Sequence, residues 1–240
     1  MTYRLYYWPG LQGRGEFVRL ALEEAGADYV DVARGKGKDQ GVAAMMRLMN
    51  APDAQTPFAP PFLVDGDVTV SHAANILLYL GPKIGLAPPS EADRHFAHAL
   101  QLTITDLLAE VHDTHHPIST NLYYEDQKVE AKARASAFLE HRMPKFLGYF
   151  ERTLARNPAG AEHPVGGQAT YVDLSLFQVW EGLRYAFPRA TAQLPQTYPH
   201  LAVLAERVRA RPGIAAYLAS PRRLPFNESG VFRHYAALDA

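Results

Sequence analysis

The hydrophobic pattern of the first 80 residues alternates between strand and helix periods. Aromatic residues are concentrated in residues 3–8, which is typical of a short strand, and Pro9 and Gly10 end it. Apolar residues then recur at helical spacing from Val18 to Ala25, and residues 29–32 predict a second strand. The chain therefore begins with a strand-helix-strand unit, which implies a parallel strand pair.

A second group of elements completes this N-terminal region. Residues 62–70 predict a β-hairpin, and apolar residues from Ile76 to Leu80 predict a helix after it. A hairpin adds antiparallel strands to the parallel pair. We therefore expect an α/β domain with a mixed sheet over residues 1–82.

The pattern changes to almost continuous helix beyond residue 91. Three prolines lie between residues 82 and 89, so we expect a linker over residues 83–91. Helical periodicity then dominates up to an irregular tail that starts at Pro221. We expect an all-α domain over residues 92–240, tail included.

Two local signals mark boundaries inside the helical domain. Thr170 followed by Asp173 has the spacing of a capping box and predicts the start of a helix. Pro144 lies inside the long helical pattern of residues 126–155, where it removes a backbone donor, so we expect a kink near Arg142.

The composition argues against several kinds of binding partner and against chemistry by a cysteine of the chain itself. The 240 residues include 24 Lys and Arg against 25 Asp and Glu, a net charge of -1, which argues against a nucleic-acid partner. No apolar run reaches the roughly 18–20 residues of a membrane helix, and the start has no signal-peptide pattern, so we expect no membrane partner and a cytoplasmic location. Cysteine is absent, so any thiol chemistry needs a thiol from a ligand.

The order of the motifs resembles that of one known family. A first strand ends in an aromatic hydroxyl at Tyr7, Pro60 and Pro61 open a hairpin, a helix begins near His72, and a capping box starts at Thr170. This order resembles the cytosolic glutathione S-transferases of the tyrosine type, over nearly the whole chain. The resemblance implies a thioredoxin-like first domain, an all-helical second domain and a homodimer.

The resemblance also implies a reaction. Glutathione would be the co-substrate, and its thiolate would attack a small hydrophobic electrophile in a pocket lined by the second domain's helices, with Tyr123 and Tyr124 as candidates. Tyr7 takes the place of the catalytic tyrosine, whose phenol O–H would stabilise the thiolate. Tyr6 remains the alternative, since adjacent strand residues face opposite sides and the register of the following loop is open by one residue.

Several further residues take the places of glutathione-binding residues in this family. His72 and Ala73 begin the third helix, where the γ-glutamyl carboxylate is held, and the lysines of residues 36–38 would meet the glycyl carboxylate. Asp106 would reach the γ-glutamyl amine across a dimer. The implied glutathione-binding set is Trp8, Arg14, Lys36, Lys38, Pro60, Pro61, His72, Ala73 and Asp106.

Two departures from the family pattern leave other functions open. Ala73 lacks the hydroxyl found at that position, for which Ser71 is a substitute if the register shifts, and Pro60 has no N–H to pair with glutathione. The alternatives are a non-catalytic or weakly binding protein of this fold, or a glutathione-dependent isomerase. In residues 112–116 two histidines are four apart without a clear third ligand, so we expect a polar helix end rather than a metal site.

Overall fold

The computed structural model describes residues 2–52 and 55–239 and divides the chain into two compact units. The first unit consists of Met1–Ala87 and Ala210–Pro225, and the second of Pro88–Arg209 and Phe226–Ala240. Sequence placed the whole of residues 92–240 in the helical domain, so the assignment of Ala210–Pro225 is a correction. Within both described ranges, no helix combines the length and the apolar character needed to cross a membrane.

The first unit is built on a sheet of four strands in the order β2-β1-β3-β4. Strand β1 (Tyr3–Tyr6) pairs in parallel with β2 (Tyr29–Asp31) and antiparallel with β3 (Phe62–Asp65). Strand β3 forms the predicted hairpin with β4 (Val68–Ser71). The mixed α/β fold predicted from sequence is thus confirmed.

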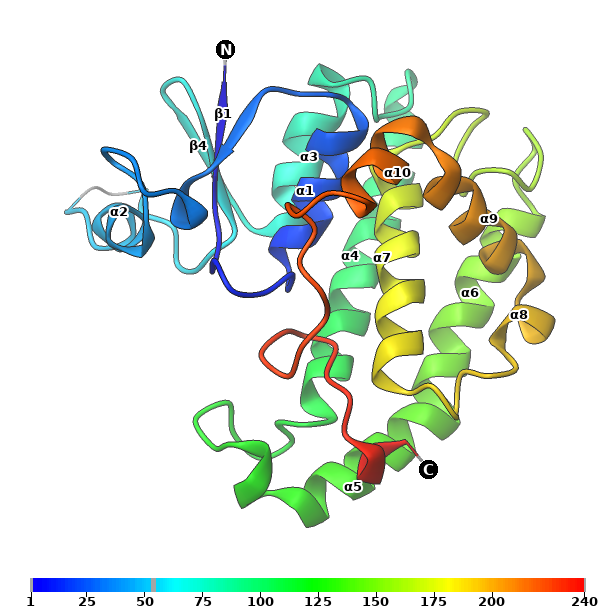
Figure 1. Cartoon of the computed structure of the whole chain (residues 1–240). Coiled ribbons are helices and arrows are strands. Elements are labelled where there is room, and N and C mark those ends of the chain that lie inside the picture. The colour runs from blue at the N-terminus through cyan, green and yellow to red at the C-terminus, as the bar shows by residue number, and fades with distance from the viewer. Residues whose placement is uncertain (1, 53–54, 240) are drawn as a thin grey trace. The chain divides into compact units, whose positions relative to one another are not determined.

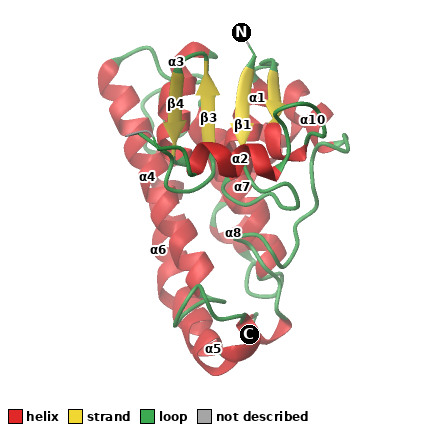
Figure 2. Ribbon diagram, turned by 90° about the vertical axis from the view of Figure 1, so that its left-hand side faces the viewer, coloured by secondary structure: helices red, strands yellow, loops and turns green. Residues whose placement is uncertain are grey.

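Helices cover both faces of this sheet (Figures 1 and 2). Leu5 packs with residues of α1 (Gly15–Glu24) and α3 (Ala73–Lys83) in one core cluster. Its neighbour Tyr6 packs on the opposite side, in a second cluster with residues of α2 (Val42–Met49). The alternation follows from the strand period of two, which sends adjacent side chains to opposite faces.

The first unit extends beyond the predicted boundary at residue 82 for a packing reason. Leu86 is only 5% exposed, and its N–H donates to the carbonyl of Gly81 at 2.8 Å. Helix α10 (Pro212–Leu218) also belongs here and packs on α1. A Cβ atom on Gly213 would lie 2.9 Å from the carbonyl oxygen of Glu23, so the glycine lets the two backbones approach closely.

The second unit is helical, as the sequence predicts. Helix α7 is buried around most of its circumference, which marks it as the central helix of this unit. The helices are α4 (Glu91–Asp113), α5 (Lys128–Ala137), α6 (Met143–Ala155), α7 (Tyr171–Ala186), α8 (Leu194–Thr197) and α9 (Pro199–Ala210).

Both boundary signals of the helical domain are confirmed. The Thr170 hydroxyl accepts the N–H of Val172 at 3.3 Å, and the Asp173 carboxylate accepts the Thr170 N–H at 2.8 Å. A π-helical turn over Phe138–Arg142 lies between α5 and α6. The helical ribbon changes direction between these two helices (Figure 1). The π-helical turn directly precedes Pro144, whose missing N–H interrupts the regular α-helical hydrogen bonds.

Candidate active site

Three segments that are far apart in sequence meet at one end of the sheet. Tyr7 follows β1, Pro60–Pro61 precede β3, and His72–Ala73 follow β4. The strand register pairs the last residue of β1 with the first residue of β3, and that residue with the last residue of β4. The His72 N–H donates to the Pro61 carbonyl at 3.1 Å, and the Pro60–Pro61 peptide bond is cis.

Tyr7 is held against the start of α1. Its side chain is 5% exposed, and its phenol oxygen accepts the N–H of Arg14, the residue that caps the helix, at 2.9 Å. Added Cβ atoms at Gly13 and Gly15 would lie 2.1 Å from the Tyr7 hydroxyl and 2.5 Å from its ring. The two glycines of the sequence Gly13-Arg14-Gly15 therefore create the space that the tyrosine occupies.

The protonation of Tyr7 suits a hydrogen-bond donor. Burial raises the pKa of Tyr7 above its ordinary value, and the Arg14 N–H opposes this only in part. The phenol is therefore neutral at pH 7. Because its oxygen already accepts one hydrogen bond, its own O–H is polarised and free to donate to a second partner.

Tyr6 occupies a different environment. Its ring stacks on Phe62 with centroids 4.5 Å apart and an interplanar angle of 11°. Its hydroxyl accepts the Nε–H of Arg4 at 3.1 Å. Tyr6 is thus a core aromatic on the α2 side of the sheet, and the geometry favours Tyr7 as the residue next to a helix N-terminus.

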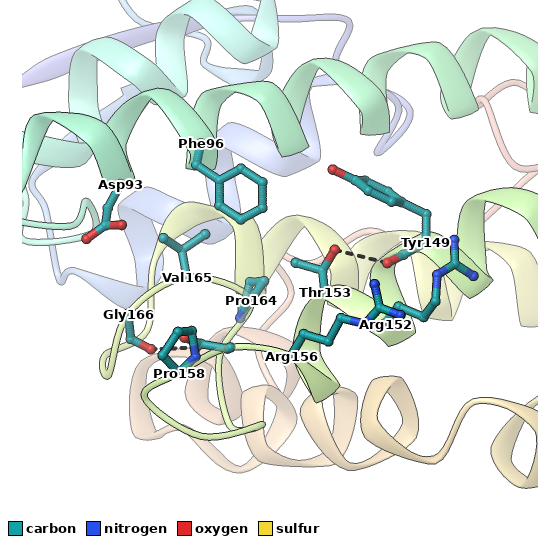
Figure 3. Close-up of a pocket in the computed structure, with 11 residues that line it drawn as sticks. Asp93, Phe96, Tyr149, Arg152, Thr153, Arg156, Pro158, Pro164, Val165 and Gly166 are labelled. Atoms are coloured by element: carbon teal, nitrogen blue, oxygen red, sulfur yellow. Dashed lines mark hydrogen bonds between the residues drawn. The ribbon is translucent and has the colours of Figure 1, made fainter.

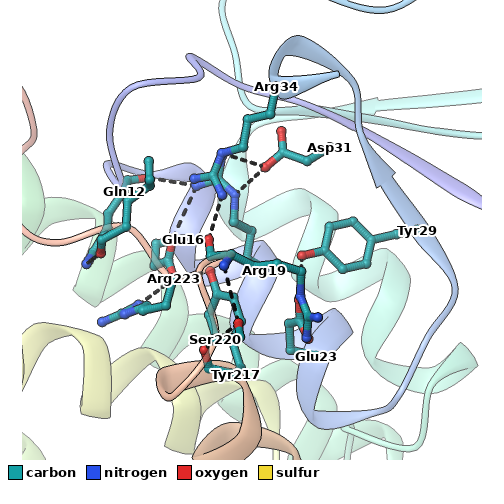
Figure 4. A network of polar contacts seen from close by, with 12 residues as sticks. Gln12, Glu16, Arg19, Glu23, Tyr29, Asp31, Arg34, Tyr217, Ser220 and Arg223 are labelled. Atoms are coloured by element: carbon teal, nitrogen blue, oxygen red, sulfur yellow. Dashed lines mark hydrogen bonds and ion pairs between the residues drawn. The ribbon is translucent and has the colours of Figure 1, made fainter. Parts of the chain in front are cut away.

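A buried charge network around Arg19 was not predicted from the sequence (Figure 4). Arg19 has no exposed surface, and its guanidinium carbon lies 5.6 Å from the centre of the Tyr7 ring. It donates to the Asp31 carboxylate at 2.7 Å, to Glu16 at 3.2 Å and to the carbonyl of Gln12 at 3.2 Å. Arg19 therefore fixes both the ring of Tyr7 and the loop that follows it.

The same network includes the returning segment Ala210–Pro225. The buried carboxylate of Glu16 accepts the Tyr217 hydroxyl at 2.7 Å and an N–H of Arg223. Burial, reinforced by Glu16, raises the pKa of Tyr217, which keeps this hydroxyl protonated. The Gln12 side chain donates to the carbonyl of Leu224 at 2.5 Å. The sequence did not indicate these contacts of Glu16, because Tyr217 and Arg223 lie about 200 residues away.

The start of α3 has the two residues expected there. His72 caps the helix with a φ of 74°, a conformation that non-glycine residues rarely adopt and that is found preferentially at functional sites. Ala73 is the first helical residue, so its N–H has no partner within the helix. Ser71 remains in β4, paired with Phe62, and precedes the cap. This helix start offers backbone donors to an anion but no hydroxyl.

The remaining predicted residues are distributed more widely. Trp8 is 39% exposed beside Tyr7 in sequence, and Lys36 and Lys38 are exposed in the loop after the short helix that follows β2. Because β2 runs parallel to β1, this loop leaves the sheet at the same end as Tyr7. Asp106 is exposed on α4 in the second unit, so it is not part of the group of residues assembled by the sheet.

The second unit has a separate pocket of about 390 Å³ between α4 and the end of α6 (Figure 3). Phe96 and Val165 form an apolar part of its wall, and Arg152 and Arg156 bring positive charge to its lining. None of the residues predicted for glutathione chemistry lines this pocket.

Comparisons with known proteins agree with this description. Residues 112–221 match the family described as Glutathione S-transferase, C-terminal domain. A glutathione S-transferase of Plasmodium falciparum (isolate 3D7) is 27% identical over 203 residues, which cover 82% of this chain and 87% of that protein. A glutathione S-transferase P of Bos taurus is 26% identical over 231 residues, which cover 95% of this chain and 98% of that protein.

A solved structure shares the fold. The Pi-class glutathione S-transferase of Onchocerca volvulus gives a TM-score of 0.71 at 20% identity and covers 96% of this chain and 99% of that one. The combination of a mixed four-stranded sheet with a helical unit is thus the thioredoxin-like plus all-α architecture. The chain is thus similar to glutathione S-transferases in the sequence of its C-terminal domain, in its overall sequence at 26–27% identity, and in its fold.

Proposed function

We propose that this protein conjugates glutathione to small hydrophobic electrophiles. The observation that carries the proposal is the buried, protonated phenol of Tyr7, which accepts the Arg14 N–H and keeps its own hydrogen to donate. The glutathione thiol would release its proton to solvent, and the Tyr7 O–H would donate a hydrogen bond to the resulting thiolate while keeping its own proton. The sulfur then attacks the electrophilic carbon, a carbon–sulfur bond forms, and the leaving group departs with its electron pair.

The free energy needed to lower the pKa of the glutathione thiol is of the size that one hydrogen bond from Tyr7 can supply. A free thiol has a pKa of about 8.5, and lowering it by ~2 units requires ~2.7 kcal/mol of preference for the thiolate. A hydrogen bond to a charged group contributes about 1.5–3 kcal/mol. The start of α1 beside Tyr7 adds a favourable helix dipole.

The other predicted residues would place the tripeptide. The backbone N–H of Ala73 and the His72 side chain would hold the γ-glutamyl carboxylate at the start of α3. Lys36 and Lys38 would meet the glycyl carboxylate, and Arg14 and Trp8 would border the site beside Tyr7. The proposal also includes a cytoplasmic homodimer in which Asp106 of a second copy meets the γ-glutamyl amine, and light scattering after gel filtration tests the dimer.

The experiment compares Tyr7→Phe with Tyr6→Phe, using glutathione and a chloronitrobenzene substrate. We expect Tyr7→Phe to lower kcat/KM by about 10- to 100-fold at pH 6.5, because the thiol loses its stabilising donor. The loss should shrink as the pH rises through the thiol pKa. Tyr6→Phe is the matched control and should keep near-normal activity, since its hydroxyl contacts Arg4 in the core. Equal rates in the two variants would reject the role of Tyr7.

A second candidate function rests on the two departures at the binding site. Pro60 cannot donate a backbone hydrogen bond to glutathione, and Ala73 offers no hydroxyl. These residues favour a protein of this fold that binds glutathione weakly or serves a non-catalytic role. Calorimetry separates the two candidates: absence of detectable heat at millimolar glutathione would support the second.

A further inference from the structure

Three histidines gather at the end of α4, in the second unit and outside the proposed glutathione site. One ring nitrogen from each of His112, His115 and His116 lies within 4.8 Å of the others. The ring centroids are 4.8 to 5.0 Å apart. The helical turn that continues past α4 brings them together, because the N–H groups of His115 and His116 both donate to the carbonyl of His112. Sequence alone indicated only the pair four residues apart.

The hydrogen bonds of two rings fix which nitrogen carries the hydrogen. The Nε2 atom of His115 lies 3.0 Å from the carbonyl oxygen of Val231, and the Nδ1 atom of His116 lies 2.9 Å from that of Leu122. A carbonyl oxygen only accepts, so both ring nitrogens are donors. The Gln127 amide nitrogen lies 3.4 Å from Nδ1 of His116, but its two hydrogens are directed to the carbonyls of Ser119 and Leu122 at 3.1 and 3.0 Å. In the neutral rings this leaves Nδ1 of His115 and Nε2 of His116 with free lone pairs. A metal-binding histidine is typically oriented in this way, by donating its other N–H to a carbonyl.

The unpaired Nδ1 atom of His115 supports a cation site independently of the clustering of the three rings. His115 is only 1% exposed, and its Nδ1 atom is buried with no hydrogen-bond partner among the described residues. Leaving a buried polar atom unpaired costs about 1–3 kcal/mol. A cation bound to Nδ1 would satisfy this atom.

The cluster opens onto a pocket that has room for further ligands. His116 forms part of the wall of a cavity of about 440 Å³, together with Tyr123, Tyr124 and Tyr235. Carboxylates of Glu125 and Glu228 also line it. The cavity can therefore hold the water or small anion that completes a metal with three protein ligands.

The charged residues around the histidine cluster are compatible with a bound cation. Arg233 lines the same cavity and repels positive charge at His115 and His116. Two carboxylates in the cavity wall oppose this single guanidinium. Neutral imidazoles also keep their affinity for divalent metals such as zinc, copper and nickel, which suits a site of low net charge.

We propose that His112, His115 and His116 form a binding site for a divalent transition-metal ion, with zinc as the fitting ion and a water molecule as its fourth ligand. Tetrahedral zinc with bonds of about 2.0–2.1 Å places its nitrogen ligands about 3.3 Å apart. The nitrogen atoms must therefore close in by up to ~1.5 Å from the observed limit of 4.8 Å. His112 is half-buried, and a change of its side-chain rotamer on metal binding would bring the nitrogens closer.

The experiment titrates the untagged, full-length, chelator-treated protein with Co²⁺ and follows visible absorption. The same samples are dialysed against Zn²⁺ and analysed for metal content. We expect one equivalent of either metal, and intense visible bands typical of a tetrahedral or five-coordinate cobalt site. The variants are His112→Gln and His116→Gln, and His115 is left intact because it is buried in the core. His141→Gln is the matched control, since the His141 side chain is 65% exposed and lies outside the cluster.

The outcomes distinguish specific metal binding at the three histidines from nonspecific binding at the protein surface. The proposal holds if His112→Gln and His116→Gln each weaken Co²⁺ binding by at least about tenfold while His141→Gln binds normally. Binding of unchanged affinity in both cluster variants, or no saturable single equivalent in the natural protein, would overturn it. Far-UV circular dichroism checks that the variants fold. If His116→Gln changes the spectrum, the half-buried His112→Gln decides the result.

Discussion

At the proposed glutathione site, the residue that would stabilise the thiolate is held firmly, whereas the residues that would bind the γ-glutamyl carboxylate lack one hydrogen-bonding group. Tyr7 is positioned from three sides, by the Arg14 N–H, by the glycines at 13 and 15, and by the buried guanidinium of Arg19. The start of α3, where the carboxylate would bind, lacks a hydroxyl, because Ala73 contributes only its backbone N–H. The residue types thus favour thiolate stabilisation more strongly than tight binding of the tripeptide.

Restoring the missing hydroxyl should strengthen glutathione binding. In the variant Ala73→Ser, a hydroxyl at the first residue of α3 would donate to the γ-glutamyl carboxylate. A hydrogen bond to a charged group is worth about 1.5–3 kcal/mol, so we expect Kd to fall by about tenfold. Isothermal titration calorimetry measures the change.

The control for this variant is Ala43→Ser, an identical change on the exposed side of α2. It should leave the affinity for glutathione unchanged. An unaltered Kd in Ala73→Ser would mean that the carboxylate does not bind at the start of α3.

Elements were predictable from sequence where a short-range pattern defines them. The parallel pair, the hairpin and the helix beginning at Thr170 follow from periodicity, turn residues and a capping box, and the structure confirms all three. The partners of Glu16 were not predictable, because Tyr217 and Arg223 are about 200 residues away and no local pattern marks them. His115 was visible in the run of residues 112–116, but its part in a cluster depends on the turn after α4, which places its ring beside those of His112 and His116.

The capping box of α7 should contribute measurably to stability. Thr170 has no exposed surface, and its hydroxyl caps the central helix of the second unit. We expect Thr170→Ala to lower the free energy of unfolding by about 1–2 kcal/mol, as measured by urea denaturation. Ser90→Ala removes an exposed cap at the start of α4 and should cost about 0.5–1 kcal/mol. A smaller effect for Thr170 than for Ser90 would contradict the importance of the buried box.

At the scale of the whole molecule, the chain leaves its first unit and returns to it. Residues 88–209 form most of the second unit, and Ala210–Pro225 then add α10 to the first. This return brings Arg223 and Tyr217 to the fully buried carboxylate of Glu16. The first unit is therefore not a contiguous stretch of sequence, which is why a boundary based on composition placed these residues in the wrong unit.

A fragment of residues 1–87 should fail to fold cooperatively by itself. Without the returning segment, the Glu16 carboxylate loses two of its three side-chain partners, and breaking a buried ion pair costs about 3–5 kcal/mol. Joining residues 210–225 to the fragment through a flexible Gly/Ser linker should restore a cooperative thermal transition in circular dichroism. The same fusion with Arg223→Gln is the control and should melt at a lower temperature. Cooperative unfolding of the bare fragment would contradict this expectation.

The return of the chain has a consequence during synthesis on the ribosome. Glu16 and Arg223 are separated by 207 positions. At about 5–20 residues per second, the acid is made roughly 10–40 seconds before its base. Of the three side-chain partners described for Glu16, Arg19 is made almost at once, whereas Tyr217 and Arg223 are made only near the end of translation. The unit whose synthesis begins first is therefore completed almost last, when the segment Ala210–Pro225 has been made.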